Sequence, residues 1–188
     1  MALRKAKCYS KAKEVPYTRK SKKKTKNFIK APPVSKVVKF TMGNKKRFEN
    51  NQFKYVIDLV TNERVQMRDN SIEACRLNIN RHLEKELGRQ NFYFQIRVYP
   101  HHILRENKML TGAGADRMQT GMKQSFGKTV GVAAQIKKGQ AIFTVALDVS
   151  QKIIKLFKAN KSKIPCRTSI VIKENKNYKP ISHDEEEE

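Results

Sequence analysis

Long hydrophobic stretches are missing from this 188-residue sequence. The longest apolar runs, Val130 to Ile136 and Ala141 to Leu147, are interrupted and fall well short of the roughly 18 to 20 residues that cross a bilayer. The chain begins Met-Ala-Leu-Arg-Lys and leads into no apolar segment of the kind found in a secretory signal peptide. We therefore expect neither a membrane protein nor a secreted one.

Cysteine is scarce, and Cys8, Cys75 and Cys166 are the whole set. Their number is odd, and they show neither a Cys-x-x-Cys motif nor a Cys/His spacing typical of zinc sites. This pattern argues against a disulfide framework and against a zinc finger. It predicts a reducing compartment, most simply the cytosol.

Acidic side chains are also few, because 17 Asp and Glu stand against 41 Lys and Arg and leave a formal net charge of +24. A compact chain that carried this surplus alone would repel itself, and solubility needs far less charge. The composition therefore predicts a polyanionic partner. Most of the surplus lies in the first fifty residues, which hold 17 basic and two acidic side chains.

Residues 1–35 are interpreted as a basic arm. Residues 4–30 include twelve basic side chains and one acid, with almost no branched apolar side chain before Ile29. Such a segment cannot bury enough apolar surface to offset its ordering entropy, so we expect it to be disordered in water and to fold against nucleic acid. Tyr9 and Tyr17 stand among the charges, where aromatic rings can stack on bases. A solvated tail that aids solubility or nuclear import is the alternative.

Residues 36–174 are expected to form a globular body. Alternation with period two predicts its strands, and apolar spacings of three and four predict its helices. The expected elements are a strand at 37–40, a turn at 42–44, a strand at 53–59, a helix at 71–87, strands at 92–98, 130–136 and 141–147, a helix at 148–161 and a strand at 168–172. This irregular order favours an α+β fold, a two-layer sandwich of a mainly antiparallel sheet with two main helices. Residues 175–188 are predicted to be a disordered tail with an acidic end.

Local patterns add detail to the body. Asn70 and Glu73 have the spacing of a capping box at the start of the longer helix, and Cys75 lies on its apolar stripe, which predicts a core position. Residues 137–140 are expected to join two strands as a hairpin or other tight connection. Asp148 is placed to cap the last helix.

Residues 101–128 break the pattern, because so long a connection inside a compact domain is uncommon. Gly112-Ala113-Gly114 starts like a dinucleotide-binding fingerprint, but Arg117 stands where a third glycine is required. Adjacent histidines point to opposite sides of an extended chain, so one of His101 and His102 should be packed and the other should face solvent or RNA phosphate. We expect neither a cofactor nor a metal.

Several interpretations of this central loop remain open from the residues alone. A glycine-rich, methionine-rich and mildly basic loop suits contact with a folded RNA. A nucleic-acid-processing enzyme would need a catalytic cluster, such as His101, Glu106 and Asp116. A histone-like protein that compacts DNA would account for the charge but not for the loop. A surface loop without a role is the simplest alternative.

Longer strings of residues resemble a known family, the L-ten-e and L-sixteen proteins of the large ribosomal subunit, also called the QM family, in their archaeal and eukaryotic type. The matching strings are Ile96 to His102, Arg105 to Met109, Gly114 to Met122, Phe126 to Lys128, Cys8-Tyr9, Pro16 to Lys20, Met42 to Asn44, Glu73 to Arg76 and Glu84 to Gly88. The resemblance covers roughly residues 4–173, and the central string is its most specific part.

This resemblance implies a structural constituent of the large ribosomal subunit, not an enzyme. Family members bind rRNA beside the central protuberance, and their basic N-terminal arm penetrates the rRNA. Their central loop, here about Arg105 to Gly114, points toward the A-site and P-site tRNA near the peptidyl transferase centre. The implied partners are large-subunit rRNA, tRNA, neighbouring ribosomal proteins and the 5S rRNA region. The implied location is the cytoplasmic ribosome, with no membrane and no homo-oligomer.

The charge pattern and the resemblance together give three groups of candidate RNA contacts. In the arm they are Arg4, Lys5, Lys7, Tyr9, Tyr17, Arg19, Lys20, Lys22, Lys23 and Lys24. In the loop, close to tRNA and the peptidyl transferase centre, they are Arg105, Asn107, Lys108, Met109, Gly112, Gly114 and Arg117. Additional contacts are His101, His102, Lys123 and Lys128.

The sequence also departs from the family pattern. Residues 21–31 are rich in lysine and lack the glycine that the family usually has there. The acidic end at 184–188 is not a family feature. The C-terminal part is shorter than in typical eukaryotic members, which favours an archaeal-type ribosome.

Overall fold

The computed structural model describes residues 5–12, 23, 25, 29, 31–107, 121–123, 127–148, 151–175 and 177–178. Its elements are β1 (Thr41–Gly43), α1 (Lys45–Glu49), β2 (Tyr55–Thr61), β3 (Val65–Arg68), α2 (Asp69–Leu87), β4 (Phe92–Ile96), β5 (His102–Glu106), β6 (Lys128–Ile136), β7 (Ala141–Leu147), α4 (Gln151–Ala159), a 3-10 turn η2 (Asn160–Lys163) and β8 (Thr168–Glu174). The predicted α+β class is confirmed.

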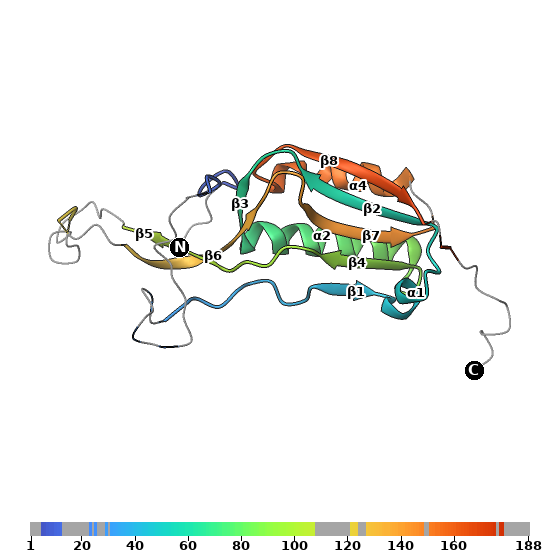
Figure 1. Ribbon diagram of the computed structural model, residues 1–188, viewed down its shortest axis with the longest axis horizontal. Coiled ribbons are helices and arrows are strands. Elements are labelled where there is room, and N and C mark those ends of the chain that lie inside the picture. The colour runs from blue at the N-terminus through green and yellow to red at the C-terminus, as the bar shows by residue number, and fades with distance from the viewer. Residues whose placement is uncertain are drawn as a thin grey trace.

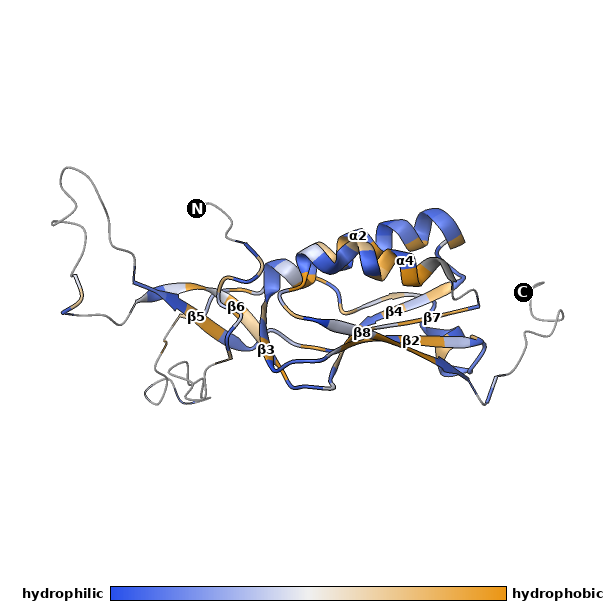
Figure 2. Ribbon diagram, turned by 90° about the horizontal axis from the view of Figure 1, so that it is seen from above, coloured by the Kyte–Doolittle hydropathy of each residue, from blue (hydrophilic) through white to orange (hydrophobic). Residues whose placement is uncertain are grey.

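The strands form two antiparallel sheets (Figure 1). The larger sheet has the order β1-β4-β7-β2-β8, and the smaller one has the order β3-β6-β5. Helices α2 and α4 lie on the same side of the larger sheet (Figure 2), which makes this part a two-layer sandwich. The smaller sheet extends from the end of the sandwich opposite α1 (Figure 1).

Three stretches of chain pass from one sheet into the other. They are β2 followed by β3, β4 followed by β5, and β6 followed by β7, so the neighbours β4-β7-β2 of the larger sheet continue as β5-β6-β3 in the smaller one. Buried Thr61 holds the corner between the sheets, since its hydroxyl donates to the Lys137 carbonyl at 2.8 Å and its carbonyl accepts from the Gly139 N–H at 2.8 Å. Gly139 adopts a φ of +80°, a conformation that glycine takes without strain.

This topology corrects the predicted hairpin. Strands β6 and β7 are joined tightly by residues 137–140, as predicted, but they pair in different sheets. Val145 of β7 pairs with Ile57 of β2, while Ala134 of β6 pairs with Met67 of β3. The hairpin pairing is wrong because the connection bends the chain across the corner, where each strand finds a non-local partner.

The start of α2 also differs from the prediction. The helix begins at Asp69, so Asn70 lies inside its first turn and does not form the predicted capping box with Glu73. Strand β3 runs directly into the helix, and the Asp69 carboxylate accepts from the Asn70 N–H at 2.8 Å. Glu73 instead binds the Arg76 guanidinium one turn later, at 2.8 Å from Nε.

Other boundaries shift in a similar way. The predicted strand at 37–40 and turn at 42–44 are wrong, because the strand is β1 at Thr41–Gly43 and Asn44 caps the short helix α1 by accepting from the Arg47 N–H. Helix α1, strand β3 and strand β5 were not predicted at all. Strand β5 occupies the beginning of the predicted 101–128 loop, so that loop is shorter than expected.

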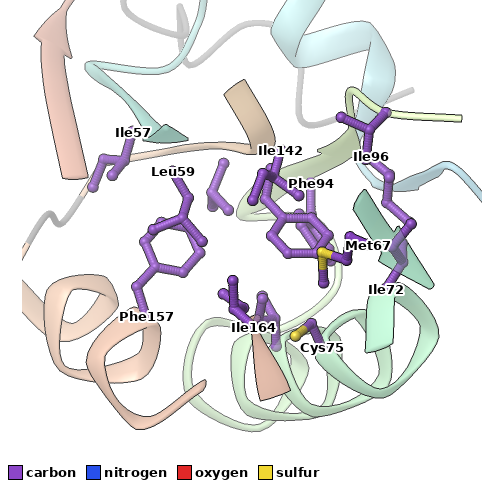
Figure 3. Close-up of a cluster of buried hydrophobic side chains, with 14 of the residues drawn as sticks. Ile57, Leu59, Met67, Ile72, Cys75, Phe94, Ile96, Ile142, Phe157 and Ile164 are labelled. Atoms are coloured by element: carbon purple, nitrogen blue, oxygen red, sulfur yellow. The ribbon is translucent and has the colours of Figure 1, made fainter. Parts of the chain in front are cut away.

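The main core lies between the larger sheet and the two helices (Figure 3). Ile153 and Phe157 of α4 are 1% exposed, and Leu156 is partly buried. Cys75 is fully buried on α2, and this burial raises the pKa of its thiol to about 12, against a smaller opposing effect of Lys163. The thiol is therefore neutral at physiological pH, and the prediction of a core cysteine is confirmed.

Candidate nucleic-acid interface

The first part of the arm lies along the free edge of the small sheet. The backbone N–H of Gln66 donates to the Ser10 carbonyl at 2.8 Å, and its side-chain amide donates to the Tyr9 carbonyl at 2.9 Å. The Arg68 guanidinium donates to the Lys5 carbonyl at 2.7 Å. Strand β3, which pairs with β6 on its other side, thus gains the arm as a neighbour. These bonds use carbonyls of the arm backbone and none of the arm side chains.

A second arm residue is anchored on the same sheet. Ile29 is 6% exposed and forms a small apolar cluster with Ile103 of β5 and Val132 of β6. Farther on, the Lys36 N–H donates to the Asp69 carboxylate at 3.1 Å. The described parts of the arm therefore contact the body at separate points, whereas the composition had suggested an arm without such contacts in the absence of RNA.

The arm lysines that the structure describes are exposed. Lys5 and Lys7 lie within the segment that is tethered to β3, and Lys23 is exposed as well. Tyr9 is half-buried and adopts a φ of +62°, which bends the chain at this point. Ammonium groups on a backbone fixed to a sheet edge are pre-arranged for phosphate oxygens, because less conformational entropy is lost when they bind.

The central loop leaves the small sheet between β5 and β6. Arg105 pairs with Thr129 and Glu106 with Lys128, at the far end of the two strands. Beyond this pair, the Asn107 side chain donates to the Gly121 carbonyl at 3.2 Å, which joins the two sides of the loop. Lys128 is exposed, as is Lys123 on the other part of the loop that the structure describes.

Gly127 allows the two sides of the loop to approach closely. A Cβ atom at this position would collide with the backbone of Glu106 and Asn107. Gly127 lies where the loop joins β6, so the close approach fixes the base of the loop. Any other residue would force β5 and β6 apart at the base of the loop.

The two histidines differ in burial, as predicted. His102 is 8% exposed within β5, whereas His101 is exposed and its Nδ1 lies 2.9 Å from the Tyr99 carbonyl oxygen. His101 can therefore meet an RNA phosphate more easily than His102. Among the described residues, no group of three or more His, Cys, Asp or Glu side chains could hold a metal ion.

The enzyme alternative gains nothing from this geometry. His101 precedes β5 and Glu106 ends it, so at roughly 3.3 Å per residue they lie on the order of 16 Å apart. A general acid and base that act on one substrate must both be within hydrogen-bonding reach of it. The third member of that cluster, Asp116, lies outside the described residues.

The structure thus brings the described arm contacts and the base of the loop together on the small sheet (Figure 1). Lys5, Lys7 and Tyr9 lie along its β3 edge, and Arg105, Asn107 and Lys128 lie toward the tip of β5 and β6. The predicted contacts outside the described residues are Arg4, Tyr17, Arg19, Lys20, Lys22, Lys24, Lys108, Met109, Gly112, Gly114 and Arg117.

Comparison with known proteins agrees with this arrangement. The family model for ribosomal protein L16p/L10e matches residues 13–171, which include both sheets up to the middle of β8 and the central loop. The chain belongs to the ribosomal protein L16p/L10e family. Membership in this family of ribosomal proteins confirms the prediction that the chain is a structural protein and not an enzyme.

Individual relatives in the L16p/L10e family span most of the chain. The large ribosomal subunit protein uL16 of Hyperthermus butylicus is 43% identical over 74% of this chain and 75% of its own length. The protein of the same name from Methanococcus aeolicus is 45% identical over 78% of this chain and 79% of its own. That of Staphylothermus marinus is 40% identical over 96% of this chain and 100% of its own. These three relatives are archaeal.

Some residues that shape this L16p/L10e interface were missed in the sequence. Gln66 and Arg68 bind backbone carbonyls of the arm, and every residue has a carbonyl, so no sequence pattern marks such a partner. Ile29 carried a weak signal, because it is the first Ile, Leu or Val after Val15 and isoleucine is among the residue types most often buried. None of the helices in the described ranges is both long and apolar enough to cross a membrane.

Proposed function

We propose that this L16p/L10e family member is a structural constituent of the large ribosomal subunit that binds rRNA through its basic arm and small sheet. The observation that carries the proposal is the family match over residues 13–171, together with archaeal relatives named as large ribosomal subunit proteins. The net charge of +24 supports a polyanionic partner of this kind. The ribosome is then its cytoplasmic location, with rRNA and neighbouring ribosomal proteins as its contacts.

A finer proposal assigns different roles to the arm and the loop. The arm, with Lys5, Lys7, Tyr9 and Lys23 among its exposed or half-buried residues, supplies affinity for rRNA near the central protuberance and the 5S rRNA region. The loop extends toward the A-site and P-site tRNA near the peptidyl transferase centre. Its support is the resemblance of the loop sequence to the archaeal and eukaryotic type of the family.

The low net charge of the loop fits tRNA, which must dissociate after it binds. Residues 105–128 hold five basic and two acidic side chains, so the loop is much less basic than the arm. Each phosphate that a protein neutralises releases counterions and strengthens binding, so many contacts would slow the departure of tRNA. A few basic groups at the base of the loop, such as Arg105 and Lys128, suit brief contacts with a passing tRNA.

Co-sedimentation with large subunits tests the main proposal. Tagged protein should migrate with the large subunit through a sucrose gradient at high salt. In isolation, its affinity for large-subunit rRNA should fall with salt by a logarithmic slope of about 0.7 to 0.9 for each phosphate contacted. Protein that stays at the top of the gradient, or that binds duplex DNA as tightly as structured rRNA, would contradict the proposal.

Arm and loop variants test the division of roles. Replacing Lys5, Lys7 and Lys23 with glutamine keeps the carbonyl contacts to β3 and the Ile29 anchor intact, so this variant should fold normally but be incorporated poorly into subunits. Arg105→Ala should leave incorporation nearly unchanged and weaken tRNA binding to the assembled subunit. The control Arg81→Ala removes an exposed charge on α2 and should change neither property. Equal loss of incorporation in the arm and loop variants would refute the division.

A further inference from the structure

An exposed aromatic stack lies beside the small sheet, and neither the arm nor the loop accounts for it. The rings of Phe40 and Tyr99 have centroids 5.4 Å apart and planes inclined by 22°. Phe40 packs against the main core, whereas Tyr99 is 63% exposed. One ring thus anchors the other, and Tyr99 presents a large aromatic surface to solvent from a supported position.

The chain around Tyr99 alternates between buried and exposed residues. Val98 is 3% exposed, Pro100 is buried, and His102 is 8% exposed, all on the inner side of the connection between β4 and β5. The intervening residues Arg97 and His101 are exposed together with Tyr99. In an extended chain, residues two apart point to the same side. A guanidinium, a phenol ring and an imidazole therefore form one exposed row.

Backbone contacts hold this row in place. The Arg97 N–H donates to the Ile142 carbonyl at 2.8 Å, and the Ile96 N–H donates to the Phe40 carbonyl at 2.8 Å. The His101 ring lies against the Tyr99 carbonyl oxygen at 2.9 Å. The row is thus fixed at both ends and fastened to the segment that carries Phe40, so the ring needs little reorganisation to receive a partner.

The charge of the surrounding segments indicates the partner. Residues 31–48 and 89–105, which meet at the stack, contain no Asp or Glu, although both contain several Lys or Arg. An exposed ring beside a guanidinium is an arrangement that binds single-stranded nucleic acid, because the ring stacks on a base and the cation contacts a flanking phosphate. The absence of acidic side chains from both segments favours an anionic partner over a hydrophobic protein.

We propose that Tyr99, supported by Phe40, is a stacking platform for an unpaired base of the rRNA, with the Arg97 guanidinium on a flanking phosphate. This inference rests on the proposed rRNA binding and adds a base-contacting site that lies outside the arm and the loop. Its recognition is tolerant of sequence, since every base has a π face. The site selects for an unpaired base and not for a particular one.

Binding to short oligouridylate and to the same backbone with abasic residues tests the stack. Tyr99→Leu should weaken binding of the oligouridylate about 5- to 150-fold, the range expected for loss of one stacked base. It should leave binding of the abasic backbone unchanged, because the phosphates remain. Tyr99→Phe keeps the ring and should bind both like the wild type. Thermal melting of each variant confirms that the fold is retained.

A tryptophan reporter locates the contact. The chain has no tryptophan, so Tyr99→Trp introduces a single one whose emission should be quenched by oligouridylate and not by the abasic backbone. Tyr178→Trp is the control, since Tyr178 is 43% exposed but follows β8 and is not part of the stack. Equal quenching of the two reporters would overturn the proposal.

The outcomes separate this inference from the proposed function. If the wild type co-sediments with large subunits but Tyr99→Leu binds oligouridylate as tightly as the wild type, the stacking site is refuted and rRNA binding stands. If the wild type does not co-sediment, the proposed function itself fails. If Tyr99→Leu reduces incorporation into subunits without changing RNA affinity, Tyr99 contacts a neighbouring protein, and the stacking proposal is wrong.

Discussion

Replacing Gly127 with alanine should open the base of the central loop. A methyl group at this position would collide with the backbone of Glu106 and Asn107, and backbone atoms cannot rotate away as a flexible side chain can. The strands β5 and β6 must therefore separate at the end where Glu106 pairs with Lys128. We expect Asn107 to lose its hydrogen bond to the Gly121 carbonyl as the two sides of the loop move apart.

The size of the effect follows from overpacking. Forcing a methyl group into a filled site costs about 1 to 3 kcal/mol, and in a chain of this size each kcal/mol lowers the melting temperature by roughly 2 to 4 °C. Thermal unfolding followed by circular dichroism should therefore show a fall of about 2 to 12 °C. The disturbance is local, so incorporation into large subunits should persist while tRNA binding by those subunits weakens.

Gly131→Ala is the matched control for this experiment. Gly131 lies in the same strand, β6, and the nearest atom to an added Cβ there is an Asp69 carboxylate oxygen at 4.0 Å. The free energy of unfolding of this variant should lie within about 0.5 kcal/mol of the wild-type value. If Gly127→Ala were as stable as Gly131→Ala and supported normal tRNA binding, the close approach at the base of the loop would have no mechanical role.

Three further predictions concern the core and the arm. Burial raises the pKa of the Cys75 thiol from 9.0 to about 12, so the unfolded state loses this proton at a lower pH than the folded state does. The free energy of unfolding should therefore not depend on this thiol below pH 9 and should fall by up to about 1.4 kcal/mol per pH unit toward pH 12. Denaturant melts should show a smaller alkaline loss of stability in Cys75→Ala, and an equal loss would contradict the assigned burial. In the same melts, Phe157→Ala should lower the free energy of unfolding by about 3 to 5 kcal/mol, whereas Lys158→Ala at an exposed position should change it by less than about 0.5 kcal/mol. Similar values for the two variants would place Phe157 outside the core. Gln66→Ala removes the side-chain hydrogen bond to the Tyr9 carbonyl, so proteolytic cleavage of the arm should become faster. The melting temperature should fall by no more than a few degrees. An unchanged cleavage rate would refute the tether.

The sequence predicted those elements whose pattern is local. The alternation of Phe92, Phe94 and Ile96 marked β4, and the apolar spacing around Ile72 and Cys75 marked α2. Gly88 follows that helix and adopts a positive φ of +78°. In each case the apolar side chains bury against one face of the sandwich, so the period of the sequence reports the geometry directly.

Pairing between distant segments could not be predicted in this way. Strand β3 has only four residues and β5 only five, and both are stabilised by pairing with β6 and not by their own alternation. For the same reason the tight connection at 137–140 was recognised while the sheets on its two sides were not. Strand propensity predicts where a strand lies in the sequence, and tertiary contacts determine which other strand it pairs with.

The candidate interface was predicted in part for similar reasons. Charge and glycine content indicated the arm and the loop, and Arg105 and Gly127 lie where the loop meets the small sheet. The tether from Gln66 depends on backbone carbonyls, which carry no residue signature. The sequence around Tyr99 indicates only the end of a strand. The stacking of its ring on Phe40 depends on a contact between distant segments, which the sequence does not show.

A density map of the large ribosomal subunit that contains this protein tests the central claim most directly. Our proposal predicts the small sheet against rRNA, with the arm following the rRNA from the β3 edge and the loop beyond Arg105 directed toward the tRNA acceptor ends. A map in which the protein is absent from the large subunit would contradict the proposed function. A map in which the small sheet and its loop face solvent would contradict the interface built from them.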